Sequence, residues 1–126
     1  MHGAAILLAT AILIAAAAQT PTEKNEFARE MNAAMDRMMD SMQIRPTGDV
    51  DRDFAAMMIP HHQGAIDMAV AELRYGTNPQ LKRIAQEIIV DQQQEIAAMR
   101  LAIGDPLPPA EPVPTQPRGY EPQRER

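Results

Sequence analysis

The sequence predicts an all-α fold, a small antiparallel bundle of three main helices. Three segments between residues 19 and 104 repeat apolar side chains every three or four positions, which is the period of an α-helix. Capping residues or Pro begin these segments, and Gly or Pro follows their ends. No segment alternates apolar and polar residues as a half-buried strand does.

The first predicted helix begins at Thr20 and ends at about Met42. Thr20 can cap it, Pro21 suits its first turn, and Glu23 completes a capping box. Between Glu23 and Met42 there are five Met but no Leu, Ile or Val. The spacing places an apolar stripe on one face of this helix, made of Phe27, Met31, Ala34, Met35, Met38 and Met42.

The second predicted helix begins near Asp49 or Asp51 and ends at about Tyr75. Apolar residues surround most of its circumference, which is typical of a central bundle helix or of one that pairs with another subunit. Pro60 falls inside this helix and removes one backbone hydrogen bond, so we predict a kink beside His61.

The third predicted helix begins at Asn78, with Pro79 in its first turn, and ends before Gly104. Its apolar stripe is rich in Ile and contains one polar residue, Gln92. A buried amide needs a hydrogen-bonding partner, so we expect Gln92 to have one.

Both ends of the chain lie outside the predicted bundle, which spans residues 19–104. Residues 1–18 contain an uncharged apolar run that ends in small residues, as a cleaved signal peptide does. We therefore expect a periplasmic or secreted protein, without membrane contact after cleavage. The alternative is an uncleaved segment that anchors the protein to a membrane. Residues 105–126 contain seven Pro and hardly any large apolar side chain, which predicts a disordered tail.

Composition excludes several functions. The formal net charge of −5 argues against a nucleic-acid partner, because phosphate binding depends on Lys and Arg. There is no Cys, so a soft metal in an oxidising compartment would have to be bound by Met thioethers. With His only at positions 2, 61 and 62, neither a carboxylate-bridged di-iron site nor a zinc-hydrolase motif can be built. We predict that the protein is not an enzyme.

The candidate metal ligands centre on the second helix. Met57 and His61 are four residues apart, as are Met58 and His62, so each pair shares one helix face. Gly64 lies on the line of Met57 and His61, where a missing side chain allows close approach. Thioether and imidazole together suit copper, as Cu(I) or Cu(II). Packing alone would also explain a Met stripe, since Met is a flexible core filler. The candidates from the first and second helices are Met31, Met35, Met38, Met57, Met58, His61, His62 and Met68.

Two segments resemble the family of domains of unknown function numbered 305. The first runs from Asp51 to Ala69 around Met57-Met58-Ile59-Pro60-His61-His62-Gln63-Gly64, and the second from Leu81 to Met99. The resemblance implies an exported protein with ferritin-like helical packing, and some members of the family bind copper in the periplasm through Met and His. It implies the ligands Met57, His61, His62, Met68 and Met99, with Met58, the methionines of the first helix and Asp53 as further candidates.

We therefore expect an exported copper-binding protein that serves metal tolerance or delivery. The broad apolar surface of the second helix favours a homo-oligomer, and a fourth helix, if present, would come from a partner chain. The alternative is a helical interaction module of the cell envelope that self-associates or binds a partner protein without metal.

Overall fold

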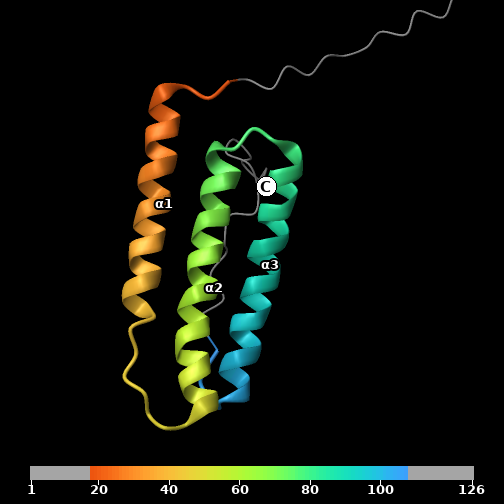
Figure 1. Cartoon of the computed structure of the whole chain (residues 1–126). Helices are drawn as coiled ribbons and strands as arrows, with labels where there is room; N and C mark the ends of the chain where they lie inside the picture. The colour runs from red at the N-terminus through yellow and green to blue at the C-terminus, as the bar shows by residue number, and fades with distance from the viewer. Residues whose placement is uncertain (1–17, 108–126) are drawn as a thin grey trace, which may run out of the picture.

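The computed structural model describes residues 18–107, and within them the chain is helical with no strand. The helices are α1 (Pro21–Ser41), α2 (Val50–Tyr75) and α3 (Pro79–Ala102), in antiparallel order (Figure 1). This confirms the all-α prediction of three main helices. Apart from Ala18, the predicted signal peptide lies outside the described residues, as does the predicted tail beyond Leu107.

Local capping chemistry explains where the helices begin. The Thr20 hydroxyl accepts a hydrogen bond from the Glu23 amide, and the Glu23 carboxylate accepts one from the Thr20 amide, so the predicted capping box is present. Of the two predicted caps of α2, the structure uses Asp49 rather than Asp51. Asn78 caps α3 as predicted. These side chains satisfy amides that the first helical turn leaves without partners.

The three helices form a row with α2 in the middle. α2 packs against both neighbours, whereas α1 and α3 do not contact each other (Figure 1). Gly64 of α2 lies against α1, and His62, about 200° away around the helix, contacts α3. The row therefore leaves two broad sides of the domain open, unlike a closed bundle. None of the described helices is both long and apolar enough to cross a membrane.

The two contacts of α2 differ in their side chains. Between α2 and α3 lies a cluster of large aliphatic residues, including Ile66, Leu73, Ile89 and Ile96, all of which are buried. Along α1, only Ala34 is buried. The aliphatic core of the described domain thus belongs to α2 and α3, and α1 is attached beside it.

Candidate metal centre

Gly64 brings the methionine stripe of α1 close to the backbone of α2. A Cβ atom built on Gly64 would lie 2.6 Å from the Met38 sulfur and 2.8 Å from the Met38 Cβ. Because any side chain at position 64 would collide with Met38, only Gly allows the two helices to approach this closely. The prediction that Gly64 permits close approach is confirmed, and the approaching group is a thioether.

His62 is buried and uses both of its ring nitrogens. Its Nδ1 lies 2.7 Å from the carbonyl oxygen of Met58, one turn earlier in α2, and its Nε2 lies 2.6 Å from Oε2 of Glu95 in α3. A carbonyl oxygen can only accept, so Nδ1 carries a proton and donates to Met58. The Nε2 contact also needs a proton, either on the ring or on the Glu95 carboxyl group. His62 therefore fastens α2 to α3.

Glu95 is the residue of the candidate site that the sequence reasoning missed. Its carboxylate accepts from Gln92, with the Gln92 Nε2 to Glu95 Oε2 distance at 3.3 Å, which confirms that Gln92 has a partner. The signal was present in the spacing: Gln92, Glu95 and Met99 are three and four residues apart and so follow one edge of α3.

One open side of the row carries the charges that link α1 to α2. Arg37 donates to Asp67 at 2.9 Å, and Arg74 donates to Glu30 at 2.5 Å. Tyr75 also donates to Glu30, at 2.8 Å. These contacts fix the rotation of α1 and α2 about their helix axes. We call this side of the row the charged side.

The methionines occupy the other open side. A helix turns by about 100° per residue, so the methionines of α1 and α2 lie about 80° or more around from the residues of the charged ion pairs. On α3, Met99 follows Glu95 by one turn, and Glu95 reaches His62 from this same side. We call this side the methionine face. It holds every methionine among residues 18–107, with Met38 at the α1–α2 contact: Met31, Met35, Met38, Met39, Met42, Met57, Met58, Met68 and Met99.

The register of the helices divides the predicted ligands into two levels. Met38 lies against Gly64, so one turn further along the antiparallel pair Met42 is level with His61. His62 contacts Glu95, so one turn further Met99 is level with Met58. The level near the α1–α2 loop thus joins residues of all three helices: Met42, Met57, Met58, His61 and Met99.

The remaining predicted ligands lie further along the helix axes, away from the α1–α2 loop. Arg37 pairs with Asp67, so Met35 is level with Met68, and Met31 lies one turn beyond Met35. Met38 lies between the two levels. Part of the predicted set thus lies at the level near the α1–α2 loop, whereas Met31, Met35 and Met68 lie nearer the other end of the helices.

The ligands near the loop differ in accessibility. Met57 is 41% exposed and His61 is also exposed, whereas Met58 and Met99 are half-buried, and Met99 packs against the aliphatic core. The ring centroids of His61 and His62 are 5.8 Å apart. His61 is thus the accessible imidazole, and His62 would have to give up Glu95 before its Nε2 could bind a metal.

A family model described as "Domain of unknown function (DUF305)" matches residues 6–103 of the chain. The chain belongs to this family. The match covers all three helices of the DUF305 domain and confirms the resemblance that the His-His motif indicated. No curated protein and no solved structure matches the chain.

Hard oxygen and nitrogen donors do not cluster in the described part of the DUF305 domain. Within residues 18–107, no group of three or more His, Asp or Glu side chains is arranged to hold a metal ion. The soft donors of this region are the thioethers of the methionine face, a donor type that favours Cu(I).

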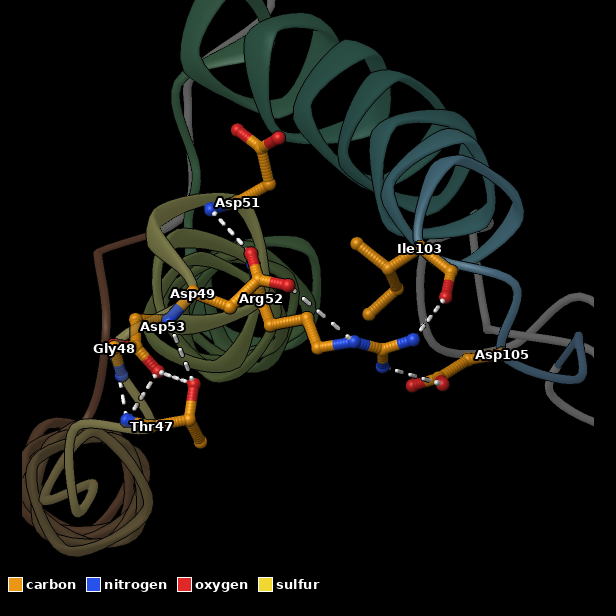
Figure 2. A network of polar contacts seen from close by, with 8 residues as sticks. All are labelled: Thr47, Gly48, Asp49, Asp51, Arg52, Asp53, Ile103 and Asp105. Carbon is orange, nitrogen blue, oxygen red and sulfur yellow. Dashed lines mark hydrogen bonds and ion pairs between the residues drawn. The ribbon is translucent and has the colours of Figure 1, made fainter.

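Asp53, a further ligand candidate by resemblance, is hydrogen-bonded to the turn that precedes α2 (Figure 2). Its carboxylate accepts from the amide and the hydroxyl of Thr47, at 2.9 and 2.7 Å, and from the Gly48 amide at 3.3 Å. These hydrogen bonds, with the Thr47 amide first, lower the pKa of Asp53 below its usual value. Asp53 thus closes the loop between α1 and α2.

Arg52 links α2 to the segment at the end of α3 near this loop. Its guanidinium donates to the Ile103 carbonyl at 3.0 Å and lies 3.8 Å from the Asp105 carboxylate (Figure 2). The start of α2 is therefore tied to the end of α3. This contact and the Asp53 turn hold the loop end of the domain, where the ligand level of three helices lies.

Proposed function

We propose that this DUF305 protein binds copper through thioethers of the methionine face and the imidazole of His61, and that it does so after export, for metal tolerance or delivery. One observation carries the proposal: apart from Met38 at the α1–α2 contact, the methionines of the described domain lie on one side of the row, together with the accessible histidine. A face of thioethers with one imidazole and no thiolate suits Cu(I). We propose binding without catalysis.

The site nearest the loop has the best combination of donors. His61 supplies an accessible nitrogen, Met57 lies one turn before it, and Met42, at the end of α1, is level with it. Cu(I) accepts such a mixed set because thioethers are soft donors and imidazole is a good donor to either copper oxidation state. His62 joins this set only if copper displaces Glu95 from Nε2, since the other ring nitrogen is already bonded to Met58.

A competition titration tests the proposal. Cu(I) is titrated into the exported protein in the presence of a chelator of known affinity, and the His61→Ala variant is compared with the wild type. We expect the affinity of the variant to fall by about tenfold or more, which corresponds to about 1.4 kcal/mol. Met57→Leu keeps the side-chain size and removes the sulfur, so a loss of affinity there would assign the thioether itself.

The matched control is Gln63→Ala. Gln63 is exposed on the charged side, two residues from His61, and donates to Asp67. We expect its copper affinity to equal that of the wild type. A His61→Ala, His62→Ala double variant that binds Cu(I) as tightly as the wild type would defeat the proposal.

A second candidate is an envelope interaction module that uses no metal. The exposed apolar side chains of the described helices favour it, because a monomer gains nothing from showing them to water. Thermal unfolding followed by circular dichroism separates the two candidates. A ligand that binds only the folded state raises the melting temperature, so an unchanged melt with stoichiometric copper would support the second candidate.

A further inference from the structure

The methionine face exposes large apolar side chains on all three helices. Each helix contributes two of them, with exposed fractions between 41% and 59%. They are Met35 and Met39 on α1, Phe54 and Met57 on α2, and Leu81 and Ile84 on α3. Scattered exposed apolar residues are normal, but a set that continues across three neighbouring helices marks an interaction surface.

The apolar core within one chain is small, so the exposed apolar residues of this face are not a surplus left over from a complete core. Of the nine buried hydrophobic residues among positions 18–107, five are Ala, and only Ile66 and Ile89 are large side chains that are fully buried. Met35 and Met39 find little apolar cover within the chain, because α1 contacts α2 alone. Burying them would add to a core that the row leaves unfinished.

We propose that a second copy of this chain covers the methionine face, so that two rows stack face to face as two layers of helices. Two layers packed around one core are the usual architecture of a small domain, and a two-fold axis lets the same face serve both copies. The association follows from apolar area and needs no copper. It uses the same face as the proposed copper site and shares Met57 with it, so the test is made without copper.

The charges favour a second copy over a lipid surface as the occupant. A helical face that binds anionic lipid is flanked by Lys and Arg, whereas the net charge of this chain is −5 and the ion pairs lie on the charged side. Met35, Met39 and Met57 carry no charge, and the Glu95 carboxylate on this side contacts His62. Two such faces can meet without burying an unpaired charge.

The chain's own C-terminal segment is a poor alternative cover. Residues 108–126 contain six charged residues and six Pro, with Val113 and Tyr120 as their larger apolar side chains. Such a segment has little apolar surface to place against six exposed hydrophobic residues. An identical face offers a matching area.

The test is the mass of the exported protein in solution, with a chelator present so that no copper is bound. Light scattering after size exclusion, over a concentration series, is expected to give twice the mass of one chain. Phe54→Glu and Met39→Glu place a charge on the face and should each raise the dissociation constant of the dimer by about tenfold or more. Val90→Glu is the matched control, because Val90 is 44% exposed but lies on the outer side of α3.

A second measurement covers variants that fail to fold. The chain has no Cys, so Met35→Cys and Val90→Cys each create a single thiol. If the face is covered, the thiol at position 35 reacts more slowly with a maleimide than the thiol at position 90, and dilution removes the difference. A wild type that stays a single chain at all concentrations overturns the proposal. The face would then have to be covered by a lipid surface, another protein or the C-terminal segment instead of a second copy. A dimer that Val90→Glu breaks and Phe54→Glu does not also overturns it.

Discussion

α2 packs against α3 and against α1 through different kinds of side chain. Toward α3 it buries Ile66, Leu73, Ile89 and Ile96, and His62 crosses to Glu95. Toward α1 it offers a glycine and ion pairs at the edge, and α1 buries only Ala34. Exposed ion pairs contribute little to stability, so the α2–α3 contact should carry most of it. Because the aliphatic core lies between α2 and α3, the methionines of α1 are not part of it.

The largest effect is expected at the centre of the α2–α3 contact. Ile89 is fully buried, so Ile89→Ala removes buried methyl groups and leaves a cavity, at a cost of about 2–5 kcal/mol. Urea unfolding followed by circular dichroism measures it. Met31→Ala on α1 is the comparison, and a loss as large as that of Ile89→Ala would break the distinction between the two contacts.

Gly64 tests the α1–α2 contact. Gly64→Ala forces a Cβ into Met38, and we expect a net loss of about 1–2 kcal/mol, because the collision outweighs the better helix propensity of Ala. In a Met38→Ala background the same change should cost nothing or stabilise the protein. A double-mutant cycle from urea unfolding measures this coupling, and strict additivity would show that α1 does not lie against Gly64.

The His62–Glu95 pair gives the next effect. Glu95→Ala leaves the Nε2 of a buried imidazole without its partner and should cost about 1–2 kcal/mol. Glu87→Ala, an exposed change on the same helix, is the control and should be close to neutral. Chemical denaturation of both variants measures the loss of unfolding free energy. Equal losses in the two variants would show that the contact of His62 with Glu95 does not stabilise the packing of α2 on α3.

The smallest effect concerns the loop that joins α1 to α2. The pKa of Asp53 is lowered in the folded protein, so its contribution to stability is present above the unfolded-state pKa of about 3.9 and is lost as the pH falls through the lower folded value. Asp53→Asn should therefore lower the melting temperature slightly at pH 7. At a pH below the folded value the two proteins should melt alike. A gap that persists in acid would mean that the carboxylate charge is not what closes the turn.

The order of the elements could be predicted from the sequence because its signals are local. The capping box at Thr20, the Asn78 cap and the apolar period each act within a few residues, and the structure confirms them. The choice between Asp49 and Asp51 could not be made from the sequence, since both side chains suit a cap. Asp49 caps the helix because its side chain accepts from the amides of the first turn.

The arrangement of the site depends on contacts between helices, which spacing within one helix does not determine. The four-residue spacing paired Met58 with His62, but the burial of His62 and its bond to Glu95 arise from the packing of α3. The approach of Met38 to Gly64 likewise requires the register of α1 against α2. Met42 was assigned to the stripe but left out of the named ligands, and that register makes it level with His61.

The placement of the methionine sulfur atoms on the methionine face also determines where oxidants would modify the protein. Peroxide or hypochlorite converts a thioether to a polar sulfoxide. In the described domain most of the damage would fall on this surface, with Met38 in the α1–α2 contact and Met99 beside the core as the exceptions. The buried part of the α2–α3 contact consists of Ile, Leu and Ala, which such reagents spare. An oxidised molecule would keep its helices and lose the character of one side.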